Sequence, residues 1–531
     1  MNNFINLNNY LLFKNPFYHF ILKRKSESGF ILNPKSLWEG NKQNGSRILN
    51  GYLNYQGESF PLDDFLKNNA SESWRDYLNS FLWLKDLSTL RTNESRIFFR
   101  NFLSNWLNKN KYFNEISWKE ETVSKRMFSL LTNLSFYFDT ANEDFQNRVA
   151  RYIFVQTKFL FHNYRFRKRE IFTIKALILS SLCIKNLEKK FPTLIDDFQK
   201  LLQEDILEDG MHYKRSPSQH FFFLCSIIDI RNFLSNAKKP IPIQLNDKID
   251  EMVNVLKFFR IADGQLSIFN EHDYIDSIKI ENVIKKGGRK IKKIPSILHS
   301  SGFHRVSKNK LTFLMDCGQP SNANTYAGSL SFEFSHQKNK IVVNCGSPFI
   351  NNKKWHEAMR STAAHSTLNL DEVNSSDIFF NKINKTRKAQ VWSEKYEENN
   401  LVWINSAHSG YRKLFGIVHN RKIHIDPLNL TIKGQDYLAK PIKGNHNIAK
   451  NFYILFHIHP EIELNVTSSK KKVVLKLKNN IGWEFICSEP VLEIGEGIYL
   501  GDGVKKENSH ILIRDSVIPN KKIKWLFRII K

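Results

Sequence analysis

Polar and titratable side chains are concentrated in one segment of the first half of the chain, Asp209 to His220, which reads DGMHYKRSPSQH. Gly210 suits the end of one helix, and Ser216 followed by Pro217 suits the start of the next. Helix ends do not account for the other polar residues, which would suit an anionic ligand: His212, Tyr213, Lys214, Arg215, Gln219 and His220. The alternative is an exposed loop in which His220 is a buried, hydrogen-bonded residue.

A second polar segment lies in the other half of the chain, at Trp355 to Asn369, and reads WHEAMRSTAAHSTLN. Arg360 and His365 are five residues apart and are flanked by serine and threonine. A cation among neutral donors can surround a carboxylate or a sulfate. Two further segments offer small residues beside a phenol or an imidazole, namely NANTYAGSLSFE at Asn322 to Glu333 and HSGY at His408 to Tyr411.

Metal ligands are sparse. His457 and His459 alternate with Ile458, so in a strand both would lie on one face, which could suit a metal. A hydrogen-bonded strand face is favoured instead, because no third ligand accompanies them at a suggestive spacing. The five cysteines lack CxxC spacing, which argues against a disulfide scaffold or a zinc cluster. Phosphate-binding loops, dinucleotide fingerprints and nucleic-acid-binding signatures are also missing from the sequence.

The elements that must position these residues change type along the chain. From about residue 73 to 262 apolar residues recur at helical spacing, and short polar breaks favour antiparallel helix hairpins. After the basic stretch Ile284 to Pro295, which suits a linker, the period becomes two and many short strands follow. We therefore predict a helical domain over 1–290 and a large antiparallel β-sandwich over 296–531.

Charge and length restrict the class of protein. The chain has 531 residues, 41% of them hydrophobic, which predicts a folded protein. Its net charge of +27 favours a polyanionic partner such as nucleic acid, anionic lipid or acidic polysaccharide. The longest apolar runs are shorter than a membrane helix requires. The N-terminus lacks the order of a secretory signal, so we expect a cytoplasmic or peripheral location, with the periplasm or cell envelope as the alternative.

The motifs, taken in order, resemble those of the heparinase II/III-like polysaccharide lyases. DGMHYKRSPSQH is similar to the family pattern DGxHxERSPxYH. The second half continues the likeness with SGFHR (301–305), LSFEFS (330–335), VVNCG (342–346), RSTAAHSTL (360–368), HSGYRKLFG (408–416), HNR (419–421) and FHIHP (456–460). The resemblance implies an incomplete (α/α) toroid of helix hairpins followed by a β-sandwich. It also implies β-elimination on uronic-acid polysaccharides, such as glycosaminoglycans, in a basic cleft.

The chain departs from the family pattern at several functional positions. The family's Tyr-His pair aligns with Gln219 and His220, and its HxHxD element aligns with Asn324, Tyr326 and Gly328. The Asn-His expected just before Lys175 is missing. Of the remaining metal positions, one is Asn344 and only His365 keeps its imidazole. Because one imidazole cannot hold zinc, we predict no bound metal, and we expect no other cofactor.

Two interpretations remain open. In the first, the chain is a divergent lyase in which Tyr326 or Tyr411 is the phenolic acid or base. His220 and His365 then act as base or orienting groups. Arg215 with Gln219 and Asn324 would neutralise the substrate carboxylate, and the substrate-binding residues would be these: His212, Arg215, Gln219, Asn324 and Arg360. In the second, the chain is a catalytically degenerate protein that binds acidic glycans or assembles envelope polysaccharide. A third class is non-specific nucleic-acid binding driven by charge, which predicts steep salt dependence and no preference among polyanions. Specific nucleic-acid binding is not expected, and the sequence leaves the oligomeric state open.

Overall fold

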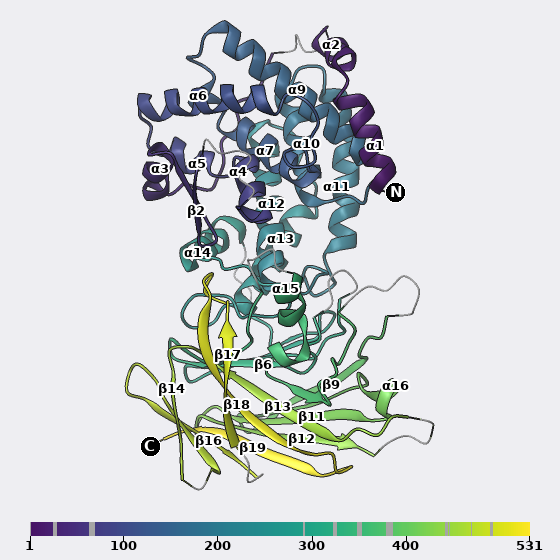
Figure 1. Ribbon diagram of the computed structural model, residues 1–531, viewed down its shortest axis with the longest axis vertical. Coiled ribbons are helices and arrows are strands. Elements are labelled where there is room, and N and C mark those ends of the chain that lie inside the picture. Colours follow the sequence, from purple (N-terminus) through teal and green to yellow (C-terminus); the bar gives the residue numbers. More distant parts are fainter. Residues whose placement is uncertain are drawn as a thin grey trace. The chain divides into compact units, whose positions relative to one another are not determined.

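The structure is a computed structural model, and many of its elements are labelled in Figure 1. It describes residues 2–24, 29–62, 69–289, 293–321, 326–347, 353–378, 386–440, 444, 446–468, 470–488 and 492–530. The chain divides into two compact units, and each is described here by itself. The first comprises Met1–Asp205 and Cys225–Asn246, and the second comprises Ile206–Leu224 and Asp247–Lys531. No helix in the described ranges is long and apolar enough to cross a membrane.

The first unit is helical. Its elements are α1 (Asn2–Phe13), α2 (Pro16–Arg24), α3 (Lys42–Leu49), β1 (Tyr52–Tyr55), β2 (Glu58–Pro61), α4 (Glu72–Ser80), α5 (Leu84–Ser88), α6 (Asn93–Lys109), α7 (Glu120–Thr132), α8 (Leu134–Tyr137), α9 (Glu143–Tyr164), α10 (Ile171–Cys183), α11 (Phe191–Asp205) and the later part of α12 (Pro217–Asn236). Side-chain caps begin several of these helices. Asn142, for example, accepts a hydrogen bond from the Phe145 amide at the start of α9.

The predicted helical stretches between residues 120 and 260 are confirmed, whereas two elements differ from the prediction. The hairpin of β1 and β2 lies in a region for which we predicted no strand. The basic stretch predicted to be a linker begins inside a helix, because α14 (Ser277–Gly287) buries Ile280 and Val283. Lys285 and Lys286 lie in its last turn, where positive charge is favourable. Residues 290–292 of that stretch lie outside the described residues.

The second unit contains two large antiparallel sheets. Besides α13 (Leu245–Phe259), α14, α15 (Lys353–Arg360) and α16 (Arg412–Phe415), its strands are β3 (Ile297–Leu298), β4 (Phe303–Lys308), β5 (Leu311–Asp316), β6 (Phe332–His336), β7 (Asn339–Val343), β8 (Leu368–Leu370), β9 (Val391–Glu398), β10 (Leu401–His408), β11 (Val418–Asp426), β12 (Thr431–Ala439), β13 (Asn451–Ile458), β14 (Glu463–Val466), β15 (Lys472–Lys476), β16 (Gly482–Cys487), β17 (Leu492–Tyr499), β18 (Lys506–Ser516) and β19 (Lys522–Ile529).

The two sheets share one core. Within the described strands, the first sheet has the order β14-β15-β16-β19-β12-β11-β10-β9, and the second has the order β17-β18-β13-β7-β6-β5-β4-β3 with β8 on β13. Buried side chains from both sheets form one apolar cluster, which includes Phe332 and Phe456 from one sheet and Ile404 and Trp525 from the other. Strands such as β10 and β11 alternate buried and exposed residues, as strands with one face on a core do. The predicted fold class, helices followed by a β-sandwich, is confirmed.

The division into units differs from the boundary at residues 290–296 that we predicted. Residues 206–224 and 247–289 belong with the sheets because their backbone pairs with sheet residues. Arg305 of β4 donates to the Phe258 carbonyl and, over 3.1 Å, to the Arg260 carbonyl. The Ile268 amide donates to the Glu333 carboxylate of β6 over 2.9 Å. The change from helical to alternating spacing of the apolar residues therefore marks the first strand of the sheets. It does not mark the start of the second unit.

Candidate active site

The DGMHYKRSPSQH segment is held by capping and by buried histidine contacts. The Ser216 hydroxyl accepts from the Gln219 amide over 3.1 Å, as predicted for the cap of α12. His220 is fully buried. Its Nε2 donates to the Met252 carbonyl over 2.8 Å, and its Nδ1 accepts from the His212 amide over 3.3 Å. Both ring nitrogens of His220 are thus bonded to the backbone, which corresponds to the alternative of a buried, hydrogen-bonded histidine. Gln219 is half-buried beside it, and His212 is buried against the Phe223 ring.

Arg215 has its guanidinium surrounded by protein groups. It is buried, forms an ion pair with Asp316, and donates to the Ser301 carbonyl over 2.7 Å and to the Gln319 carbonyl over 2.8 Å. Its guanidinium carbon also lies 4.7 Å from the centre of the Phe303 ring. These contacts join the loop before α12 to the sheet. Arg215 is therefore not our candidate for the group that neutralises a substrate carboxylate.

Tyr326 lies in the segment that leads to β6 and is almost fully buried. Its hydroxyl is 2.8 Å from the Ser347 hydroxyl, which also accepts from the His272 amide over 2.9 Å. Burial raises the pKa of Tyr326 above its ordinary value, and nearby Glu271 adds to the effect. The phenol is therefore protonated at neutral pH and suits the role of a proton donor.

His365 lies beside Tyr326 as a neutral imidazole. The two ring centres are 6.1 Å apart, with the rings nearly perpendicular. Burial lowers the pKa of His365 to about 4, although a hydrogen bond to the Ser361 carbonyl opposes the shift. That carbonyl is 2.7 Å from Nδ1, so Nδ1 carries the proton and Nε2 keeps its lone pair. His365 thus has the protonation state of a base.

Gly328 makes room for this imidazole. A β-carbon on Gly328 would lie 2.4 Å from Cδ2 of His365 and 2.9 Å from Nε2. A side chain at this position would therefore displace the ring. The family resemblance places a metal ligand at Gly328, and here the His365 ring packs against the position instead.

Arg360 brings positive charge to the same place. Its guanidinium carbon lies 5.8 Å from the centre of the Tyr326 ring. Burial lowers the pKa of Arg360, while Tyr326 and Glu271 oppose the change, and an arginine side chain remains a cation throughout. Unlike Arg215, Arg360 is only half-buried, so it is the better candidate for pairing with a substrate carboxylate.

The segments that carry these three residues are tied together. The Ala327 amide donates to the Arg360 carbonyl over 2.9 Å, and the Thr362 hydroxyl donates to the Ala327 carbonyl over 2.8 Å. A cation, a protonated phenol and a neutral imidazole are therefore held on adjacent backbone segments. Such a set can neutralise a carboxylate, accept a proton and donate a proton.

Sequence reasoning missed the residues that support Tyr326. Glu271, His272 and Ser347 lie on two loops far apart in the sequence, and only the fold brings them to the phenol. The run of polar residues at Asn270 to Asp273 was a usable signal, but no family motif covers it. Asn324, which we predicted to bind substrate, lies outside the described residues.

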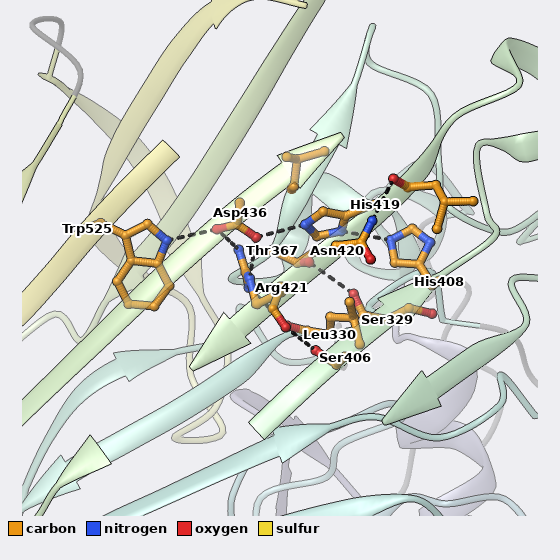
Figure 2. A network of polar contacts seen from close by, with 12 residues as sticks. Ser329, Leu330, Thr367, Ser406, His408, His419, Asn420, Arg421, Asp436 and Trp525 are labelled. Atoms are coloured by element: carbon orange, nitrogen blue, oxygen red, sulfur yellow. Dashed lines mark hydrogen bonds and ion pairs between the residues drawn. The ribbon is translucent and has the colours of Figure 1, made fainter. Parts of the chain in front are cut away.

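Tyr411 and the HSGY segment form part of a different, fully buried network. The Tyr411 hydroxyl donates to the Leu368 carbonyl over 3.0 Å. Figure 2 shows His408 joined to His419, and His419 joined in turn to Asp436. These contacts measure 3.0 and 2.8 Å, and Arg421 and Trp525 bind the same carboxylate. The side chains of His408, His419, Arg421 and Asp436 are fully buried, so we interpret this network as part of the sandwich core.

The family's metal positions do not fit a metal in this chain. They fall on Tyr326, Gly328, Asn344 and His365, which offer a single imidazole. Asn344 is occupied, since its amide group donates to the Ile268 carbonyl over 2.8 Å and its oxygen accepts from the Ser366 amide. Among the described residues, no three His, Cys, Asp or Glu side chains form a metal-binding group. His457 of the FHIHP motif instead contacts Cys345 and the Ala363 carbonyl.

The buried histidines predict a loss of stability in weak acid. Burial lowers the pKa of His220, His272 and His365 to about 4, from an ordinary value of 6.5. Between these pH values the unfolded chain binds protons that the folded chain excludes. The free energy of unfolding should therefore fall as pH drops through this window, by up to about 1.4 kcal/mol per pH unit for each histidine. Urea unfolding at several pH values from 7.5 to 4 measures this slope, and a flat profile would contradict the neutral assignments.

Comparison with known proteins agrees with the fold. Residues 292–526 match the profile of the heparinase II/III-like C-terminal family. The structure of heparinase III superposes with a TM-score of 0.73 at 13% identity, covering 97% of this chain and 89% of that one. A mutant of the heparan sulfate lyase HepC from Pedobacter heparinus gives a TM-score of 0.65 at 14% identity, covering 96% and 87%. These likenesses establish a shared fold.

The chain also has a sequence relative whose name does not mention a lyase, namely FtsZ-localized protein C from Caulobacter vibrioides. It is 24% identical over 511 residues, covering 91% of this chain and 87% of the relative. The match to the family profile covers the sandwich that carries Tyr326, Arg360 and His365, and the structural match extends over the helical unit as well. This chain therefore matches the heparinase II/III-like C-terminal family over residues 292–526, and it shares the fold of heparinase III.

Proposed function

We propose that this chain is a lyase-like protein that cleaves uronic-acid-containing glycans by β-elimination. The observation that carries the proposal is the juxtaposition of Tyr326, His365 and Arg360 on tied segments of the sandwich. The net charge of +27 supports an acidic substrate, since long-range attraction concentrates polyanions near a basic protein. The fold shared with heparinase III supports the same class of substrate.

Each residue has one role in this proposal. Arg360 pairs with the uronate carboxylate and so makes the neighbouring C5 proton more acidic. Nε2 of His365 accepts that proton, and the electron pair of the C5–H bond forms a double bond between C4 and C5. The C4–O bond breaks, and the Tyr326 phenol gives its proton to the leaving oxygen. Exchange with solvent then restores both side chains.

The test is the ultraviolet absorbance of unsaturated uronate during incubation with heparan sulfate, chondroitin sulfate, hyaluronan, alginate and bacterial capsular polymers. We expect absorbance to rise with one polymer. A flat trace with every polymer, in samples where the protein is folded, would contradict the lyase proposal.

Replacing Arg360 with alanine should lower kcat/KM by about 10²-fold or more, because the uronate carboxylate would lose its cation. Arg360→Lys keeps the charge but not the two-pronged geometry, so it should recover only part of the loss. Arg387→Ala is a comparison for a lost guanidinium, since Arg387 donates to the Ser375 and Gly410 carbonyls and pairs with Asp377. Equal turnover in the Arg360→Ala variant and the unaltered protein would remove Arg360 from the mechanism.

The second candidate is a protein that binds acidic glycan, or helps assemble envelope polysaccharide, without cleaving it. Two observations favour it. The retained family residue His220 has both nitrogens bonded to backbone groups, and Arg215 is paired with Asp316. The relative FtsZ-localized protein C is named for where it is found rather than for a reaction. Saturable binding to one polymer without any rise in absorbance would select this candidate.

A further inference from the structure

A groove crosses the outer face of the sheet formed by β9, β10, β11, β12, β19 and β16. It has a volume of about 590 Å³ and is lined mainly by residues of these strands. The opposite face of the same strands is the sandwich core, where Ile404 and Ile425 are buried. None of the residues that we place in the candidate active site lines this groove.

An aromatic row forms one side of the groove. Tyr396, Trp403 and His424 are cross-strand partners on β9, β10 and β11, so their side chains lie on the same face. The rings of Tyr396 and Trp403 are nearly parallel, with centres 5.1 Å apart and an angle of 8°. The His424 ring lies 5.1 Å from that of Trp403. Together they form a platform of stacked rings, in which Tyr396 is 44% exposed.

A second row, two residues along the strands, is polar and basic. Asn405, Lys422, Gln435 and Lys524 are successive cross-strand partners on β10, β11, β12 and β19, and Glu394 of β9 continues the row beyond Asn405 without lining the groove. The two rows are about 7 Å apart along the strands. Lys433 of β12 is the cross-strand partner of His424, so it lies at the end of the first row, beside the aromatic side chains. All three lysines are exposed, and none forms an ion pair with a carboxylate within the described part of the chain.

We infer that this groove is a second glycan-binding site that holds an acidic polysaccharide chain away from the catalytic residues. The aromatic platform offers apolar ring edges and the exposed part of Tyr396 to the C–H groups of a sugar ring. The lysines offer cations to carboxylates or sulfates, and the two amides offer donors and acceptors to hydroxyls. The inference rests on the proposed function for the class of glycan, but it does not require that the protein cleave it.

Charge and ring geometry argue against other occupants. A second copy docked face to face would bring two sets of Lys422, Lys433 and Lys524 together, and no carboxylate of the described residues lines the groove between them. A nucleic acid needs aromatic rings spaced so that bases stack on each of them. Tyr396 and Trp403 already stack on one another, which leaves no space for a base between them.

The experiment measures binding of the full chain to immobilised heparan sulfate, chondroitin sulfate, hyaluronan and alginate, with neutral dextran as a blank. Trp403→Ala should weaken binding to the preferred polymer at least tenfold. Trp392→Ala is the matched control, because Trp392 is 50% exposed on the same edge strand but does not line the groove. It should bind within about twofold of the unaltered protein. The double change Lys422→Gln and Lys524→Gln leaves the platform intact, and it should weaken binding and flatten its dependence on salt.

Turnover of a short uronate oligosaccharide separates this inference from the proposed function. Trp403→Ala should leave that turnover unchanged, because the groove is not part of the candidate active site. If no variant or substrate gives turnover, the lyase proposal fails while the binding comparison still stands. The inference is overturned if folded Trp403→Ala and the double lysine variant bind every polymer as the unaltered protein does. It is also overturned if oligo(dT) displaces the glycan at equal concentration, or if the groove proves to be closed by a dimer.

Discussion

Replacing Tyr326 with phenylalanine is expected to lower kcat for β-elimination by about 10²- to 10⁴-fold, the usual contribution of a positioned proton donor. The phenol hydroxyl is 2.8 Å from Ser347 and is the group that we assign to protonate the leaving oxygen. Phenylalanine keeps the ring that packs beside His365 and Arg360, so the other two roles remain in place. Initial rates of absorbance increase at saturating polymer measure the effect.

Tyr411→Phe is the matched control for this prediction. Tyr411 is also a buried tyrosine on a family motif, but its hydroxyl donates to the Leu368 carbonyl. Each variant loses one hydrogen bond, so each should lose about 1 kcal/mol of stability. Only the Tyr326 variant should lose turnover. Equal turnover in both variants would contradict the role given to Tyr326.

Replacing Asp436 with asparagine is expected to reduce the free energy of unfolding by about 3–5 kcal/mol. Burial opposes ionisation of this carboxyl, yet Arg421 and His419 hold its pKa well below the ordinary value. Its two oxygens accept from His419, Arg421 and Trp525 in the sandwich core (Figure 2). Asparagine would leave the fully buried Arg421 cation without a counter-charge. Urea unfolding at pH 7 measures the change.

An exposed ion pair gives the comparison for Asp436. Asp515 pairs with Lys521 at 2.7 Å, and both side chains are more than a quarter exposed. Asp515→Asn should therefore cost no more than about 1 kcal/mol. If the Asp436 and Asp515 variants unfolded at the same urea concentration, the buried network would not be the stabilising feature that its contacts suggest.

The fold was largely predictable because hydrophobic periodicity reports on local geometry. The change from helical to alternating spacing located both halves, and the Ser216–Pro217 pair correctly marked the start of α12. What the periodicity could not reveal was long-range pairing. Arg305 binds the carbonyl of Phe258 in the last turn of α13 and that of Arg260 just after it, so helical residues belong to the sheet unit despite their helical spacing.

The candidate site was predictable by residue type but not by role. Tyr326, His365 and Arg360 were all found from their motifs, and the structure places them together. Arg215, His220 and Tyr411 were found in the same way, yet each is bonded to protein groups. A sequence lists hydrogen-bonding side chains but not their partners. Whether an arginine neutralises Asp316 or a substrate therefore depends on tertiary contacts that spacing does not encode.

The most direct test of the central claim is the mass spectrum of products from a defined uronate oligosaccharide incubated with the unaltered protein. β-Elimination leaves an unsaturated uronate at the new non-reducing end, so that fragment is lighter by one water than the corresponding product of hydrolysis. We predict this lighter fragment, and we predict that it is lost in Tyr326→Phe but not in Tyr411→Phe. Recovery of intact oligosaccharide, or of hydrolysed fragments alone, would contradict the account.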